Sequence, residues 1–332
     1  MSEEAGAKAE PVVARPAAAK QSGATGGSAQ RMKMENKNDN YKTTYTGERA
    51  QYFAENKAYE SALFCEGESP LKHATDVKLK DSAFQWKYPL WNSENINVED
   101  TVFLEMGKAG IWYTNNITLR NCEIKAPKEF RRSKNITLEN VDFSNALETF
   151  WNCSDVKLKN VKARGDYFAM NTQGFRAENF TLDGNYFLDG GKNIEIYDSV
   201  INSKDAFWNC ENVTVYNSRI CGEYLGWYSR NLKFVNCIIE SNQGLCYVEG
   251  LTLVDCRFEK TTLAFEYSSG IDAKVDSYIE SVKNPLSGKI CAKEIGTLIL
   301  NPKRTKIADV VIECSRVGQT FSEDPNDNEN EF

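Results

Sequence analysis

A unit of about nineteen residues recurs through most of this chain. Each unit opens with a polar residue or glycine, followed by two apolar residues that are separated by one position. The openings are Asp76-Val77, Asn95-Ile96, Asn116-Ile117, Asn135-Ile136, Asp155-Val156, Gly174-Phe175, Asn193-Ile194, Asn212-Val213, Asn231-Leu232, Gly250-Leu251 and Gly270-Ile271. A short fixed period predicts a solenoid, in which each unit packs only against its neighbours. Residues that are distant in sequence then align in columns, so a site must be sought as a group of columns.

Positions within the unit are numbered here from its first apolar residue, which is position 0. Positions 0, +2, +5 and +7 are mostly apolar, as in Ile117, Leu119, Cys122 and Ile124. The alternation at 0 and +2 predicts a short strand with one face turned inward. Position +4 holds Asn or Asp in ten successive units: Asp81, Asp100, Asn121, Asn140, Asn160, Asn179, Asp198, Asn217, Asn236 and Asp255. Because Asn and Asp accept left-handed backbone and bond to nearby amides, this column predicts a tight corner with an amide ladder.

Leucine-rich repeats have a similar length, but each unit of that class usually carries a helical segment. The present pattern lacks a helical period, and β-branched and aromatic residues dominate its repeats. It predicts an all-β protein, a single-stranded parallel β-helix of about 11–13 coils. The crossover rule makes the helix right-handed, and its coils would stack about 4.8 Å apart. Residues 58–76 read as one further degenerate coil, and residues 45–60 and 295–316 are candidate caps. An insertion of two residues at Glu105 and Met106 predicts a small outward bulge.

The chain of 332 residues is expected to contain one folded domain between two tails. Residues 1–44, rich in Ala, Gly, Pro and Ser, predict a disordered leader or linker. Residues 45–316 would form the β-helix domain with its caps. Residues 317–332 predict a disordered acidic tail.

Charge and hydropathy exclude several classes of protein. The net charge of −7 argues against a nucleic-acid partner, which normally needs a basic face. No run of eighteen apolar residues occurs, so no membrane association through a spanning segment is expected. The leader also lacks the continuous apolar stretch of a secretory signal.

The ten cysteines do not follow a disulfide or metal pattern. Cys122, Cys237 and Cys256 share one apolar column, which is typical of buried free thiols and indicates a reducing, cytoplasmic location. The single histidine, His73, stands apart, and no cluster of Asp residues marks a cation site. We therefore expect no metal and no cofactor.

One outward column carries the main indication of function. Position −6 is apolar, whereas position −5 holds Trp91, Trp112, Arg131, Trp151, Met170, Asp189, Trp208, Trp227, Cys246 and Glu266. A column with Arg, Asp and Glu is unsuited to burial, and neighbouring residues of a strand face opposite sides, so position −5 should point outward. Five of the six tryptophans would then form a row on one outer face. Exposed aromatic rows rarely persist without a partner.

The row favours a carbohydrate ligand, because flat rings suit the apolar faces of sugars and nearby polar groups bind hydroxyls. The expected ligand-binding residues are Trp91, Trp112, Arg131, Trp151, Asn171, Lys204, Trp208, Glu223, Trp227 and Tyr228. Two alternatives stay open: a terminal segment or long loop covers the row, or the row is a protein interface. The second includes a non-catalytic scaffold and a homo-oligomer formed through the tryptophan face or the helix ends.

Carboxylates beside the row make glycoside cleavage conceivable, since a pair of them performs acid and base steps. The catalytic candidates are Asp166, Asp189 and Asp205. An enzyme of this kind would resemble a glycoside hydrolase, or a polysaccharide lyase if a cationic base removed a proton. The competing interpretation is that these charges form ordinary surface ion pairs, such as Lys204 with Glu223 and Arg131 with Glu148. Catalysis and binding alone both remain open.

Several strings of the sequence resemble a bacterial domain-of-unknown-function family, number 3737, over about residues 47–300. The strings are Gly67–Lys72, Trp86–Trp91, Ala109–Tyr113, Ala126–Arg131, Ser203–Cys210 and Gly222–Trp227. The resemblance implies a right-handed parallel β-helix of the pectin-lyase-like class, with no established activity or catalytic residues. Most enzymes with that fold act on acidic polysaccharides, which supports a carbohydrate ligand by analogy. Without a visible signal peptide, an intracellular oligosaccharide or glycan precursor fits better than an extracellular polymer.

Overall fold

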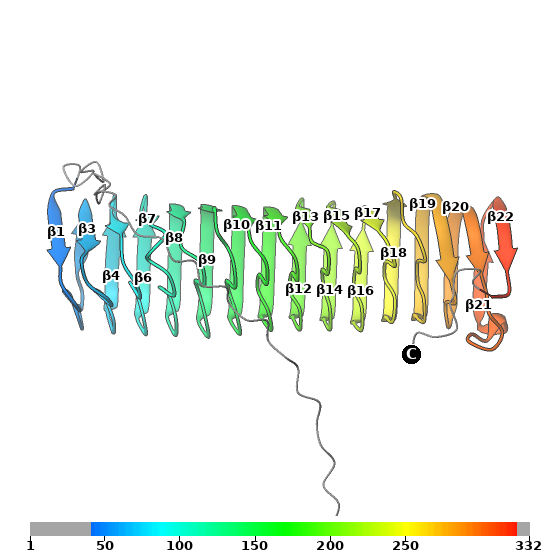
Figure 1. Ribbon diagram of the computed structural model, residues 1–332, viewed down its shortest axis with the longest axis horizontal. Coiled ribbons are helices and arrows are strands. Elements are labelled where there is room, and N and C mark those ends of the chain that lie inside the picture. The colour runs from blue at the N-terminus through cyan, green and yellow to red at the C-terminus, as the bar shows by residue number, and fades with distance from the viewer. Residues whose placement is uncertain (1–40, 324–332) are drawn as a thin grey trace, which may run out of the picture. The chain divides into compact units, whose positions relative to one another are not determined.

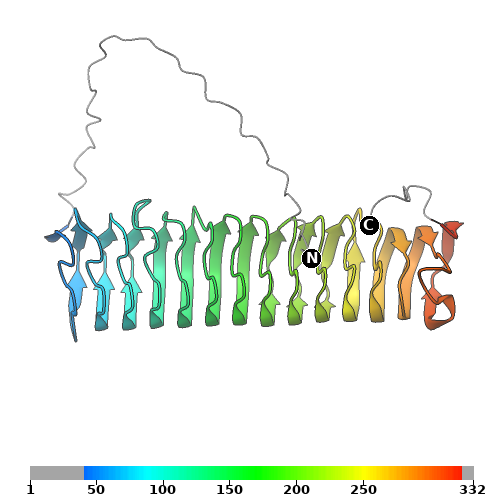
Figure 2. The ribbon, with the colours of Figure 1, turned by 60° about the horizontal axis from the view of Figure 1, so that its bottom comes forward.

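The chain folds as a stack of parallel β-coils in a computed structural model that describes residues 41–323, all within one compact unit, Asn38–Phe332. The strands follow one another along the stack in the order of the sequence (Figures 1 and 2). This confirms the all-β solenoid. It has about 15 coils rather than 11–13, because periodicity is weak at both ends of the sequence. Most of the predicted leader and acidic tail lies outside the described residues.

Each coil has three sides, and a continuous parallel sheet covers two of them. Strands on the first side alone are β2 (Ala58–Glu60), β4 (Thr75–Lys80), β6 (Glu94–Glu99), β12 (Lys192–Tyr197), β14 (Glu211–Tyr216), β16 (Arg230–Val235) and β21 (Val310–Glu313). Strands on the second side alone are β1 (Thr43–Thr46), β3 (Ala62–Cys65), β5 (Ala83–Phe84), β7 (Val102–Phe103), β13 (Val200–Asn202), β15 (Arg219–Gly222), β17 (Ile238–Ser241) and β22 (Arg316–Phe321). Strands that bend across both sides are β8 (Asn115–Ile124), β9 (Lys134–Phe143), β10 (Ser154–Arg164), β11 (Gln173–Asp183), β18 (Glu249–Phe258), β19 (Ser269–Lys283) and β20 (Gly288–Ile299).

The ends of the solenoid differ slightly from the expected boundaries. Strands begin at Thr43, and β22 continues to Phe321, so residues 317–321 belong to the last coil and not to a tail. The candidate caps at 45–60 and 295–316 contain strands of ordinary coils, interrupted by a short 3-10 helix, η2 (Ile307–Asp309). The insertion at Glu105 and Met106 forms an exposed turn.

Position 0 of every coil faces a continuous core. Val77, Ile96 and Ile117 are paired in register on successive strands and all are buried. At position −6, Phe130 and Phe150 stack inside the coil with ring centres 4.6 Å apart. Inward residues therefore align with their counterparts one coil away, and apolar burial is continuous along the axis.

The corner between the first and second sides is the predicted asparagine ladder. All ten Asn and Asp residues of position +4 have a positive φ near 50°, which these two residue types tolerate best after glycine. Asn140 Nδ2 donates to Asn121 Oδ1 at 3.0 Å, and Asn160 Nδ2 donates to Asn140 Oδ1 at 2.9 Å. Every bond points to the preceding coil. A new ladder starts at Asp198, which accepts from Asn217 at 3.1 Å, because an ionised Asp has no proton to donate.

A column of buried hydroxyl and thiol groups at position −3 secures the third side, where the backbone alternates into positive φ. Phe150 and Asn152, for example, have φ of 59° and 55°, which costs about 1–2 kcal/mol per residue without compensation. Ser229 Oγ donates to Phe207 O at 2.6 Å and accepts from Cys210 N at 2.8 Å. Equivalent donors occur at Ser93, Thr114, Ser133, Cys153, Thr172, Cys210 and Ser268. Side chains from one coil thus fix the strained backbone of the coil before it.

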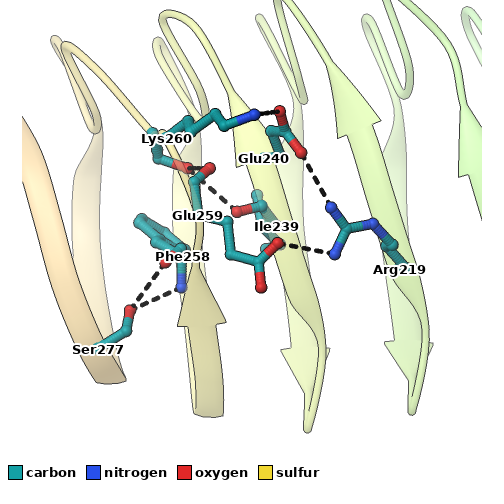
Figure 3. Close-up of polar contacts among 8 residues, drawn as sticks. Arg219, Ile239, Glu240, Phe258, Glu259, Lys260 and Ser277 are labelled. Atoms are coloured by element: carbon teal, nitrogen blue, oxygen red, sulfur yellow. Dashed lines mark hydrogen bonds and ion pairs between the residues drawn. The ribbon is translucent and has the colours of Figure 1, made fainter.

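A charged cluster joins three coils on the second side (Figure 3). Arg219 from β15 contacts Glu240 at 2.9 Å and reaches past that coil to Glu259 at 2.8 Å. Lys260 approaches Glu240 from the other direction at 3.6 Å. Networks of this kind stabilise more than isolated surface pairs do, so the cluster clamps neighbouring coils together.

The ten cysteines are all free, and Cys122, Cys237 and Cys256 are buried as predicted. Within residues 41–323, no helix is long and apolar enough to cross a membrane. The same residues contain no group of three or more His, Cys, Asp or Glu side chains that could hold a metal ion.

Candidate functional site

The predicted aromatic row lies on the third side of the solenoid. The backbone N–H at position −4 bonds to the carbonyl at position −5 of the next coil, as in Asn92 to Trp112 at 2.7 Å and Arg132 to Trp151 at 3.0 Å. These bonds place the five tryptophans of position −5 in one column. Each of the five is half-buried, so the column is outward but less exposed than we expected.

Four tryptophans also have a structural role. The indole Nε1 of Trp112 donates to Lys128 O at 2.7 Å, and that of Trp208 donates to Tyr224 O at 2.9 Å. Trp151 and Trp227 make the same bond to the coil that follows them. Tryptophan suits this position because its ring is long enough to reach the next coil, where the indole N–H donates to a backbone carbonyl on the third side.

The rings also cover one another along the axis. Trp208 and Trp227 lie 9° from parallel with centres 5.9 Å apart. The Arg131 guanidinium lies between Trp112 and Trp151, 4.5 Å from each ring centre. Much of each ring face is therefore occupied by a neighbour, which leaves less room for face-on stacking of sugars than the sequence suggested.

The row extends further toward the N-terminus than sequence reasoning placed it. Tyr52 and Phe53 occupy positions −5 and −4 of an earlier coil, and Phe53 is 64% exposed. The Phe53 ring stacks on His73 at 5.1 Å, and His73 Nδ1 is 2.6 Å from Asn92 Nδ2. The spacings of about twenty residues between Tyr52, Lys72 and Trp91 could have revealed this extension.

The three candidate catalytic carboxylates occupy three different environments. Asp166 lies at the corner between the second and third sides, where its Oδ1 accepts from Asn185 N at 2.7 Å. Asp189 stands in the tryptophan column and accepts from Asn209 Nδ2 at 3.1 Å. Asp205 is only 3% exposed, and its Oδ2 has no partner among the described residues. The three carboxylates therefore stand in three different columns of the coil, at positions −9, −5 and −8.

Burial is the main cause that raises the pKa of Asp205. The Lys204 ammonium opposes this effect, while the charges of Glu223 and Asp189 reinforce it. Asp189 and Asp205 are thus close enough to interact, whereas Asp166 is not among the groups that shift Asp205. A raised pKa suits a carboxyl for proton donation, but Asp205 is almost fully buried.

The ion pairs that competed with a catalytic interpretation are present. Lys204 Nζ lies 3.2 Å from Glu223, and Arg131 lies 3.2 Å from Glu148. Glu148 also pairs with Lys128 at 2.9 Å. Lys204, Glu223 and Arg131 are therefore engaged within the protein.

A groove of about 750 Å³ runs along the corner between the second and third sides. Its floor is backbone, because Gly165, Gly184 and Gly222 recur there at multiples of nineteen residues. A Cβ atom on Gly184 would lie 2.1 Å from Gly165 O, and one on Gly222 would lie 2.2 Å from Ser203 O. Glycine is required for this close approach of the coils, and it leaves the corner hollow.

Several polar groups along this corner groove remain available. Asp166 Oδ2, Asn185 Nδ2 and the Asn202 amide have no hydrogen-bond partner within residues 41–323. Arg164 and Asp183 form a loose pair at 3.6 Å in the column that also contains Asn202. Tyr167 and Tyr186 stack 4.7 Å apart at position −8, next to Asp166 and Asn185 in the sequence. Of the predicted site residues, this groove brings together Asp166 and Lys204.

A second groove, of about 880 Å³, runs over the first side. Its amides at Asn193, Asn212 and Asn231 belong to a second asparagine ladder at position −1. Arg176 in this groove pairs with Glu195. Much of its polar lining is already bonded within the protein, in contrast to the corner groove.

These features define a parallel β-solenoid with a polar groove beside a row of aromatic side chains. The chain belongs to the family described as a protein of unknown function (DUF3737), whose model matches residues 38–313. The family resemblance is thereby confirmed. No curated protein and no solved structure matches the chain.

Proposed function

We propose that this protein binds an extended oligosaccharide or polysaccharide segment along the corner groove, beside the tryptophan and tyrosine face. The observation that carries the proposal is a set of polar atoms above a floor without side chains. They are Asp166 Oδ2, Asn185 Nδ2 and the Asn202 amide, which have no hydrogen-bond partner within residues 41–323. Carboxylates and amides of this kind bind the paired donors and acceptors of sugar hydroxyls.

The size of the groove suits a short run of sugar rings. Its lining residues come from five successive coils, and at about 4.8 Å per coil these span about 19 Å. The tyrosines Tyr167 and Tyr186 contribute apolar surface next to the polar column. The repeated coils present similar groups at equal intervals, which matches a ligand that is itself a repeating chain.

Binding without cleavage is the form of the proposal that the geometry favours. Inversion requires two carboxyl groups about 6.5–9.5 Å apart across one bond, and retention requires about 5 Å. Only Asp166 of the three candidates lines the groove, while Asp205 is buried. If a bound saccharide is nevertheless cleaved, Asp166→Asn and Asp205→Asn will report whether these carboxyl groups take part.

The test is a titration of the full chain with a panel of neutral, acidic and amino-sugar oligosaccharides, followed by calorimetry. We expect one class to bind, and Asn202→Ala and Asp166→Asn each to weaken it about tenfold, or about 1.4 kcal/mol. Asn97→Ala is the matched control, since Asn97 is exposed and lies outside the groove. Failure of the whole panel at millimolar concentration would refute the proposal. If all variants bind the saccharide equally, the binding site lies outside the corner groove.

A reducing, cytoplasmic setting belongs to the same proposal. The free buried thiols support it, because Cys153 and Cys210 donate to carbonyls in the column at position −3 and so act as small polar core residues. Thiol alkylation of the protein isolated from its source should find all ten cysteines reduced.

A further inference from the structure

The third side has opposite charge at its two ends. In positions −5 and −4, from Tyr52 to Arg132, the charged residues are Lys72, Arg131 and Arg132, with no carboxylate. From Trp151 to Tyr267 the charged residues of the same positions are Asp189 and Glu266, with no Lys or Arg. Glu266 is buried and pairs with Lys283 at 3.2 Å, so the half-exposed carboxylate of these positions is Asp189. Lys72 and Arg132 have no carboxylate partner among the described residues, and Asp189 has no cationic one.

The flanking positions −9 and −8 repeat this division. The first half contributes Lys87, Lys108 and Lys128, together with Glu68, which pairs with Lys87. Glu48 and Arg49 of the first coil pair with each other and add no net charge. The second half contributes Glu148, Asp166 and Glu223, with Lys204, which pairs with Glu223, as its single cation. Asp205 also stands at position −8 but is buried. Glu148, the first carboxylate after the cations, already pairs with Lys128 and Arg131 within the chain. The sign of the charge therefore changes near Trp151.

Apolar surface accompanies the charge in both halves. Phe53 is 64% exposed and Tyr113 is 37% exposed in the positive half, while Tyr228 is 55% exposed in the negative half. All three stand at position −4. Aromatic residues and Arg are enriched at the centres of protein interfaces.

We propose that two copies of this chain associate face to face and antiparallel through their third sides. A two-fold axis across the row reverses the order of coils and leaves each column opposite the same column of the other copy. The positive half of one copy then faces the negative half of the other, and the contact is self-complementary, as a two-fold interface must be. Lys72 and Arg132 lie over the acidic half of the second copy.

The dimensions suit a stable dimer. The row spans twelve coils from Tyr52 to Tyr267, or about 50 Å at the usual strand spacing. The third side of the coil, measured across the row, is about 15 Å wide. Each copy would bury about 750 Å², close to the roughly 800 Å² per partner of standard interfaces. This inference does not depend on saccharide binding, although the groove shares Asp166 and Lys204 of position −9 with the charged face.

Charge reversal tests the arrangement. Lys72→Glu/Arg132→Glu reverses the two cations of the positive half that have no carboxylate partner among the described residues. Asp189→Lys/Asn209→Lys replaces the carboxylate of position −5 in the negative half, and the neighbouring amide, by cations. Analytical ultracentrifugation of the full chain at micromolar concentration should find a wild-type dimer, with each double variant at least tenfold weaker in self-association. An equimolar mixture of the two variants should recover a dimer that contains one copy of each, because both halves then attract.

The control is Lys78→Glu/Lys159→Glu, which reverses two exposed charges outside the third side and should leave the dimer intact. Circular dichroism checks that all variants keep the fold. A monomeric wild type at tens of micromolar overturns the proposal. So does self-association that survives in either double variant, or a mixture that stays monomeric.

Discussion

Glu129 occupies an unusual environment for a carboxyl group, at position −7 inside the coil. It is fully buried, and its Oε2 accepts from Gly110 N at 2.9 Å. Its Oε1 and the Thr149 Oγ1 of the next coil both lack partners among the described residues. Gly110 is a necessary neighbour, since a Cβ there would lie 2.7 Å from Glu129 Oε2. Burial raises the pKa of Glu129 well above its usual range, which favours the neutral form of the group.

This environment predicts a dependence of stability on pH. The unfolded chain releases the Glu129 proton near pH 4.5, whereas the folded chain retains it to higher pH. The unfolded state therefore binds fewer protons above pH 4.5, and the free energy of unfolding falls as the pH rises toward the folded pKa, by up to about 1.4 kcal/mol per unit. Glu129→Gln should remove this loss and be more stable than wild type at pH 8.

Urea unfolding at intervals from pH 4.5 to pH 8.5 measures the effect. Glu178→Gln, at an exposed position, should follow the wild type throughout. Identical pH profiles for Glu129→Gln and wild type would show that Glu129 does not titrate as its burial implies.

The ladder at position +4 is the element in which the same side-chain hydrogen bond is repeated from coil to coil. Asn both donates and accepts, so it fits the interior of a ladder, while Asp only accepts and fits its start. Asp100 and Asp198 stand at starts and accept from the Asn residues that follow them. The choice between Asn and Asp in this column thus follows from hydrogen-bond direction.

This rule predicts opposite effects for two exchanges of amide and carboxyl. Asn140→Asp removes the donor to Asn121 Oδ1 and sets two oxygens against each other, which should cost about 1 kcal/mol. Asp198→Asn supplies a donor toward Asn179 and keeps the bond from Asn217, so it should stabilise by about 0.5–1.5 kcal/mol. Urea unfolding measures the change in unfolding free energy of each variant, from the shift in midpoint at an unchanged m-value. The two variants serve as controls for each other, because opposite shifts are expected. Shifts of the same sign would contradict the rule.

The elements differ in how far the sequence predicted them. The columns at positions 0, +2 and +4 were predictable because one type of chemistry repeats in nearly every coil. The column at position −3 was missed because six residue types occur there: Ser, Thr, Cys, Ala, Gly and Val. Only the first three share a side chain that can donate a hydrogen bond. The corner groove depends on how closely Gly184 approaches Gly165, a distance between coils that no local pattern contains. The stacking of Trp208 on Trp227 depends on side-chain torsions, which periodicity does not determine.

The whole molecule is built from contacts between neighbouring coils. Strand β11, for instance, pairs only with β10 before it and with β12 and β13 after it. Stability is then close to a sum over coils and their interfaces. No distant segment has to be in place for a coil to pack.

Removal of one complete coil should therefore be tolerated. Deletion of residues 194–212 joins Asn193 to Val213 and keeps every column in phase. We expect a folded, cooperatively unfolding protein whose far-ultraviolet circular dichroism remains that of a β-solenoid. Deletion of residues 194–203 alone shifts the phase at the junction and should abolish cooperative unfolding. Equal behaviour of the two deletions would argue against independent coils.

The asparagine ladder runs in the order in which a ribosome makes the chain. Asp100 emerges before Asn121, and Asn121 emerges before Asn140, while each amide donates to the residue made before it. A new coil thus meets acceptors that are already positioned, and the first member of each ladder needs no donor at all. Translation and the growth of the ladder proceed in the same direction, so the nascent chain can extend its solenoid one coil at a time.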